Sequence, residues 1–116
     1  MTFERPDWLT EPCPAWCDGE HAGQHLEDDR CHHSDYRVVP IIQQQRRWPR
    51  PALRPGDDVE AGELNVLTFR SVGARETWIA IANDQQKLEL THESACRLHA
   101  ALGSLLRDVS DEREKP

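Results

Sequence analysis

Seven side chains that can bind a metal ion crowd into residues 13–33. They are Cys13, Cys17, His21, His25, Cys31, His32 and His33. Thiolate sulfur and imidazole nitrogen are the ligands that tetrahedral Zn²⁺ prefers, so the segment predicts a zinc site. From the Leu, Ile, Val and Phe set, residues 1–35 contain only Phe3, Leu9 and Leu26. Because ordering a backbone costs roughly 1–2 kcal/mol per residue, we expect the metal to hold together a segment that apolar burial cannot.

The spacing favours three of these side chains as ligands. Cys13, Cys17 and His21 follow one another at four-residue steps. If Pro14 opens a short helical turn, such steps place all three on one helical face. A further step to His25 brings the total drift round the helix to about 120°. We therefore expect His25 to lie outside the site and the fourth ligand to return from further along the chain.

The fourth ligand is predicted from charge and reach. Cys31, His32 and His33 are the candidates that follow. A Cys₂His₂ site is neutral and suits a segment that carries nine acidic residues, whereas Cys₃His leaves a negative centre. We favour His33, with Cys31 as the main substitute, and His32 and His25 stay open.

Two other metal chemistries use the same residue types. Asp18 and Glu20 lie beside the predicted ligands, so a zinc hydrolase is one alternative. No HExxH motif is present, however, and the order of residues in zinc deaminases is not matched. An iron–sulfur cluster would need Cys31 as a third thiolate, an uncommon ligand set. The abundance of ligands favours a closed, structural zinc site and a protein without enzymatic activity.

Chain length and cysteine usage indicate the class of protein. At 116 residues the chain fits one domain with a modest core. Residues 1–10 have neither a basic region nor an apolar run, so no secretory signal is visible, and no stretch approaches a membrane span. We expect a cytoplasmic protein, where clustered cysteines hold metal more often than they form disulfides.

The remaining residues predict an α+β fold, a small antiparallel sheet of three to four strands packed by one C-terminal helix. β-branched and alternating patterns predict strands at 36–42, 63–72, 77–82 and 87–90, the first at a sheet edge or at a bulge because of Pro40. The expected organisation is a polar tail at 1–12, one zinc-containing domain at 13–110 and a tail at 111–116. The domain divides into a zinc segment at 13–35, a sheet at 36–90 with an Arg/Pro-rich loop at 43–58, and a helix at 91–110.

The helix has both a start signal and an apolar stripe. Thr91 supplies an N-cap oxygen and Glu93 an anion in the first turn. The residues at helical spacing, which we expect to face the sheet, are Ala95, Leu98, Leu102, Leu105, Leu106 and Val109. Cys96 lies off this stripe and has no predicted role.

Two surfaces could bind partners. The loop residues that combine guanidinium groups with an aromatic ring, a mixture that can grip nucleic acid, are Arg46, Arg47, Trp48, Arg50 and Arg54. A net charge of −7 disfavours nucleic acid as the main partner. A sheet covered by a single helix also leaves its second face open. That face would carry either Trp78, Ala80 and Ala82 or Ile79 and Ile81. We therefore predict a regulatory or protein-interaction module with an unidentified protein partner, and a homodimer as one way to cover that face.

Three parts of the sequence resemble motifs of a known family. They are the block CPAWCDGEH at residues 13–21, the pair His33-Ser34, and the helix start with Leu90, Thr91, Glu93 and Ala95. They are similar to a family of small uncharacterised actinobacterial proteins with a C-P-x-W-C-x(3)-H motif and a C-terminal LTxExA helix. In that family two cysteines, a histidine and a later histidine look like zinc ligands, which correspond here to Cys13, Cys17, His21 and His33. Trp16, inside the motif, is expected to pack over the metal or against the sheet. The resemblance implies no activity.

Overall fold

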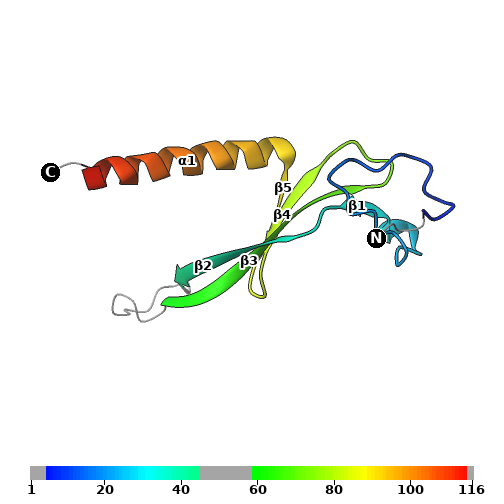
Figure 1. Cartoon of the computed structure of the whole chain (residues 1–116), viewed down its shortest axis with the longest axis horizontal. Helices are drawn as coiled ribbons and strands as arrows, with labels where there is room; N and C mark the ends of the chain where they lie inside the picture. Colours follow the sequence, from blue (N-terminus) through cyan, green and yellow to red (C-terminus); the bar gives the residue numbers. More distant parts are fainter. Residues whose placement is uncertain (1–4, 45–58, 115–116) are drawn as a thin grey trace.

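A computed structural model describes residues 5–44 and 59–114 of the chain. It has an antiparallel sheet with one C-terminal helix, as the sequence predicts (Figure 1). The elements are a short 3-10 helix η1 (Glu27–Asp29), β1 (Cys31–His33), β2 (Arg37–Gln44), β3 (Val59–Ser71), β4 (Trp78–Ala82), β5 (Lys87–Thr91) and α1 (His92–Glu114).

Strand β3 organises the sheet. Its N-terminal half pairs with β2 and its C-terminal end pairs with β1, while β4 and then β5 follow beside it. Ser34, between β1 and β2 in the chain, is bonded to β3, because its backbone N–H donates to the Thr68 carbonyl and its hydroxyl accepts from the Thr68 N–H. The sheet has five strands and not three or four, since β1 consists of candidate ligands that give no strand signal.

The predicted strands are present with small shifts in their ends. β2 pairs only with β3, so Pro40 lies in an edge strand, where its missing N–H costs no ladder bond to a second neighbour. Gln43 and Gln44, predicted to begin the Arg/Pro-rich loop, belong to β2. The rest of that loop, residues 45–58, lies outside the described residues.

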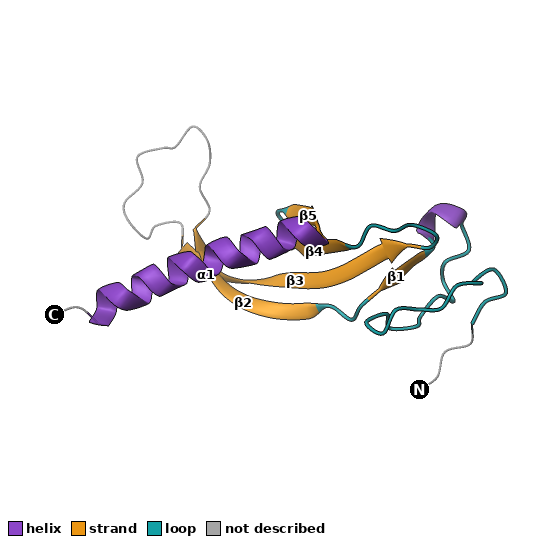
Figure 2. Cartoon of the chain, turned by 90° about the horizontal axis from the view of Figure 1, so that it is seen from above, coloured by secondary structure: helices purple, strands orange, loops and turns teal. Residues whose placement is uncertain are grey.

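Apolar burial is sparse throughout the described residues. Leu9 and Ala80 are the buried hydrophobic side chains, and the largest fully buried side chains are His21 and His32. The molecule is elongated, with extents of 61 × 32 × 28 Å (Figure 2). Its best-buried side chains are thus candidate metal ligands, which places the tightest packing at the N-terminal end.

Helix α1 begins where the sequence predicts, but only its first turns pack against the sheet. The Thr91 hydroxyl accepts a hydrogen bond from the Ser94 N–H at 3.1 Å, which is an N-cap. Ala95 and Leu98 are half-buried, and α1 contacts β4 and β5. The rest of the predicted stripe is exposed: Leu102, Leu105, Leu106 and Val109. The helix also continues to Glu114, beyond the predicted end at residue 110.

The cap gives a first prediction. Thr91→Ala removes the oxygen that satisfies the Ser94 N–H, so the free energy of unfolding should fall by about 1 kcal/mol. Chemical denaturation followed by circular dichroism measures this loss. Thr91→Ser keeps the oxygen and serves as the control; an equal loss in both variants would contradict a capping role.

Candidate metal centre

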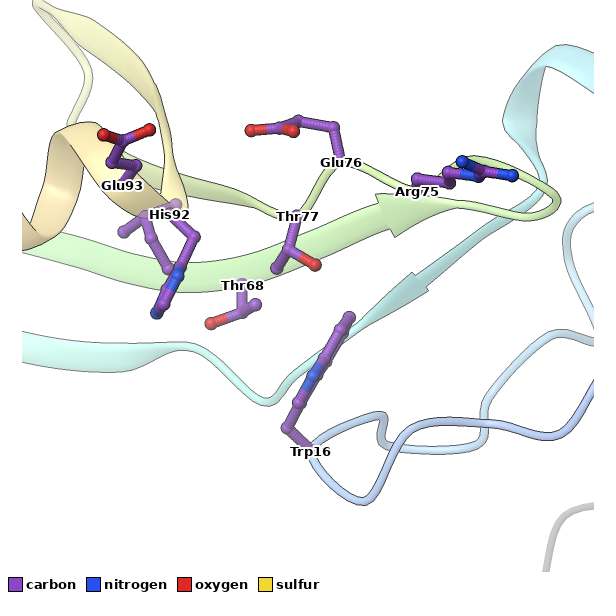
Figure 3. Close-up of a pocket in the computed structure, with 8 residues that line it drawn as sticks. Trp16, Thr68, Arg75, Glu76, Thr77, His92 and Glu93 are labelled. Carbon is purple, nitrogen blue, oxygen red and sulfur yellow. The ribbon is translucent and has the colours of Figure 1, made fainter.

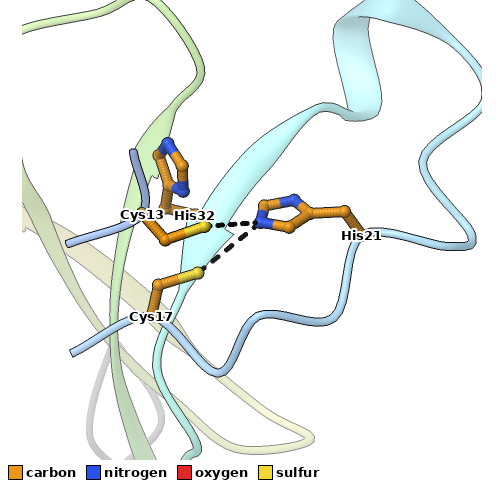
Figure 4. A group of neighbouring side chains, drawn as sticks. All are labelled: Cys13, Cys17, His21 and His32. Carbon is orange, nitrogen blue, oxygen red and sulfur yellow. Dashed lines mark hydrogen bonds between the residues drawn. The ribbon is translucent and has the colours of Figure 1, made fainter. Parts of the chain in front are cut away.

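Four side chains from two segments meet at the N-terminal end of the sheet. The ligand atoms of Cys13, Cys17, His21 and His32 all lie within 4.8 Å of one another (Figure 4). His21 Nε2 is 3.4 Å from Cys13 Sγ and 3.7 Å from Cys17 Sγ. A tetrahedron with metal–ligand bonds of about 2.0–2.3 Å has edges of about 3.3–3.8 Å. The two nitrogen–sulfur distances therefore match those between ligands of one tetrahedral ion.

Turns, and not a helical face, bring the first three ligands together. The Cys17 N–H donates to the Pro14 carbonyl at 3.0 Å, which closes a tight turn between the cysteines. Gly19 has a φ of 81°, a left-handed conformation that glycine adopts without a steric penalty. A second turn follows, where the Gln24 N–H donates to the His21 carbonyl. The three side chains predicted from their spacing do converge, but turns bring them together and not the helical face inferred from that spacing.

The fourth member of the group is His32, and the structure places His33 outside it. Side chains alternate between the faces of a strand, so neighbours in β1 point in opposite directions. His32, opposite Arg70 in β3, is fully buried in the group. His33 instead has its Nδ1 3.1 Å from a carboxylate oxygen of Asp18, and its carbonyl accepts from the Asp18 N–H. His33 thus fastens the cysteine turn to β1.

The substitute ligand Cys31 also lies outside the group. Its backbone N–H donates to Gln24 Oε1, and its carbonyl accepts from Gln24 Nε2. Gln24 Oε1 also lies 2.9 Å from His21 Nδ1. Because an amide oxygen can only accept, Nδ1 must carry the proton, which leaves His21 Nε2 free to bind a metal. Gln24 therefore orients one ligand and ties it to β1. His25 is exposed and is not part of the group.

The state of His32 fits a metal ligand. Its side chain is 0% exposed, yet neither ring nitrogen has a hydrogen-bond partner. Buried polar atoms are seldom left unpaired, because losing water without a replacement costs free energy. Glu11 Oε1 lies 3.5 Å from His32 Nε2 and accepts from the Gly73 N–H at 2.6 Å. A carboxylate beside one nitrogen is the common second partner of a metal-bound histidine, and it leaves Nδ1 for the ion.

Burial shifts the pKa of two members of the group, His32 and Cys13. It lowers the pKa of His32, because the charged imidazolium is disfavoured away from water, and neutral imidazole is the form that binds metal. Burial and then the neighbouring Cys17 raise the pKa of the Cys13 thiol, while Arg5 acts in the opposite direction. Binding a metal must therefore release protons from thiols, so the affinity falls as the pH is lowered.

Part of the predicted polar tail packs on the centre. Leu9 is 5% exposed, and the Trp8 ring meets the His21 ring edge-on at 5.8 Å between centroids. The Arg30 guanidinium lies 4.5 Å from the centre of the Trp8 ring. This covering role of Trp8 was not predicted from the sequence. A large aromatic beside the ligand motif is the only signal that could have indicated it.

Trp16 belongs to the turn between the two cysteines, and its ring lies beside the sheet. Arg70 of β3 stands 5.5 Å from its ring centre, consistent with the prediction that Trp16 packs against the sheet. Its ring also lines an open pocket of about 610 Å³ with Thr68, Thr77 and His92 (Figure 3). Two acids and an arginine complete its polar rim, namely Arg75, Glu76 and Glu93.

The other predicted features are placed as follows. The predicted partner-binding residues Arg46, Arg47, Trp48, Arg50 and Arg54 lie outside the described residues. Cys96 is exposed on α1, with its sulfur 3.8 Å from His92 Nε2. Within the part of the chain that the structure describes, no helix combines the length and apolar character needed to cross a membrane.

Comparison with known proteins gives two matches. A family model described as "Domain of unknown function (DUF6907)" matches residues 2–115. A fungal protein named "Transcription factor opdR", from Penicillium oxalicum, is 33% identical over 64 residues. That match covers 55% of this chain but spans only 8% of the fungal protein's length. No solved structure matches the chain significantly.

The choice between adjacent histidines gives the second prediction. His32→Ala should weaken zinc binding by more than the roughly 10–100-fold that loss of an outer hydrogen-bond partner costs, because it removes a proposed ligand. His33→Ala should change zinc affinity far less, since that side chain bonds Asp18. Competition with a chromogenic chelator measures both affinities. A larger loss for His33→Ala would assign the fourth position to His33.

Proposed function

The chain belongs to the DUF6907 family of domains of unknown function, and on that premise we propose that it is a non-enzymatic zinc protein. The zinc is structural, and the protein acts as a regulatory or protein-interaction module. The observation that carries the proposal is the convergence of four side chains, Cys13, Cys17, His21 and His32. The imidazoles of both histidines are buried. This donor set matches structural Zn²⁺ sites, which are closed by four protein ligands.

The surroundings of the group support a structural metal over a catalytic one. A catalytic zinc keeps one position open for water or substrate and needs a general base nearby. Two carboxylates beside the group, those of Glu11 and Asp18, already have partners that hold the chain in place. Glu11 accepts from Gly73, and Asp18 accepts from Glu20 and pairs with His33. These acids therefore support positioning, and a zinc hydrolase becomes the weaker alternative.

The same geometry favours zinc over an iron–sulfur cluster. A cluster is held mainly by thiolates, and a third thiolate would have to come from Cys31. Cys31 lies outside the group of converging ligands.

All four cysteines are unpaired, which also supports the proposal that the protein works in a reducing, cytoplasmic environment.

Nucleic-acid binding is the second candidate function. The name of the fungal relative, a transcription factor, and the arginine-rich segment from Arg46 to Arg54 favour it. The net charge of −7 opposes non-specific attraction to phosphates. If the candidate is correct, binding to random-sequence DNA should weaken with salt and fall when Arg46, Arg47 and Arg50 are changed to Ala. Unchanged binding in the triple variant, measured by fluorescence anisotropy, would exclude this segment as the contact.

Metal removal gives the main test of the structural role. A ligand at 100 times its Kd adds about 2.7 kcal/mol of stability. Chelation should therefore lower the melting temperature by about 10 °C or more for a domain of this size. Calorimetry of the purified full chain with and without chelator measures the shift.

Elemental analysis of the same samples identifies the metal. We expect one zinc per chain in the wild type and in Cys96→Ser, whose thiol is exposed and remote from the group. Cys17→Ser should lose most of the zinc. Stoichiometric iron, or zinc retention in Cys17→Ser, would contradict the proposal.

A further inference from the structure

Helix α1 exposes a leucine-rich stripe that its own sheet does not cover. Leu102, Leu105, Leu106 and Val109 are 49%, 62%, 65% and 48% exposed. Every residue from 104 to 112 is exposed. Among the described strands, α1 contacts only β4 and β5, so neither β2 nor β3 shields it. A helix of this length owes most of its stability to packing of its apolar face, which indicates that something covers this stripe.

The spacing of the stripe indicates another helix as the covering element. Ala95, Leu98, Leu102, Leu105 and Val109 are separated by three, four, three and four residues. This alternation is the heptad pattern of a coiled-coil seam, in which residues of one helix insert between those of its partner. The stripe is also self-complementary, because a two-fold axis across it places leucines of one copy against leucines of the other.

The surface that the chain exposes is large enough for packing against a second copy of the chain. The protein exposes 9740 Å². A compact chain of 13.3 kDa exposes about 6,500 Å². A standard interface removes about 800 Å² from each partner, so the excess is ample for a stable dimer. The predicted covering of a β4 face is not where the need lies, since Ala80 is buried and the rest of β4 is half-buried.

We propose that two copies of this chain form a two-fold dimer through α1, with the 95–109 stripe of each helix packed on the other. The inference rests on the proposed function in one respect, because it names the partner of the interaction module as a second copy. The metal centres then lie away from the interface, since the metal group and the free end of α1 lie at opposite ends of the molecule (Figure 1).

Light scattering after size exclusion tests the inference on the full, zinc-loaded chain. The wild type should have twice the 13.3 kDa chain mass. Leu102→Glu combined with Leu105→Glu should give a monomer, because four charges would be buried in the seam. Ala100→Glu is the matched control: it introduces the same side chain about 170° round the helix from the stripe, and should remain a dimer. A monomeric wild type, or a dimeric double variant, would overturn the proposal.

Two further measurements keep the result interpretable. If the double variant does not fold, Leu105→Ala should still raise the dimer dissociation constant at least about tenfold, as expected for truncating a central contact; an unchanged constant would overturn the proposal. Zinc content is measured on every sample. A monomer that retains zinc refutes the dimer alone, whereas a dimer without zinc refutes the metal proposal alone.

Discussion

The N-terminal third of the molecule depends on one group of side chains. Residues 5–30 have little apolar surface to bury, and their backbone follows turns with few hydrogen bonds to the sheet. What they share is the meeting of Cys13, Cys17 and His21 with His32, which belongs to β1 and is therefore part of the sheet. A metal bound by all four would connect a segment without a core to a stable strand. Gln24, Asp18 and Glu11 each reinforce that connection.

This arrangement separates two tasks along an elongated molecule. At one end, polar ligands and aromatic rings make a compact centre from residues that a hydrophobic core would exclude. At the other, α1 extends past the sheet and exposes the side chains that a core would normally contain. The proposed zinc takes the place of an apolar core at one end, so the leucines of α1 are not needed there. In the proposed dimer these leucines pack against the helix of the second copy. A small protein can in this way hold a stable fold and still present a large apolar surface.

The sequence predicted the fold class, the strands β2 to β5, the helix cap and three of the four converging side chains. Local chemistry determines each of these: β-branched runs, a Thr at a helix start, and cysteines spaced for a turn. The fourth side chain depends on which face of β1 each histidine occupies, and pairing with β3 fixes that choice. Nothing local distinguishes His32 from His33. Likewise, the stripe on α1 predicted burial against the sheet along its whole length, but only Ala95 and Leu98 are half-buried, because spacing along a helix does not say how far the sheet beneath it extends.

Amide hydrogen exchange with and without chelator tests most directly whether the metal replaces a core. The zinc-loaded protein should protect the amides of Cys17, Asp18 and Gln24, which donate hydrogen bonds in and around the centre. Chelation should remove that protection while the amides that pair β3 with β4 keep theirs, because their ladder is independent of the centre. Equal protection of the N-terminal amides in both states would contradict the account, since the segment would then hold its fold without metal.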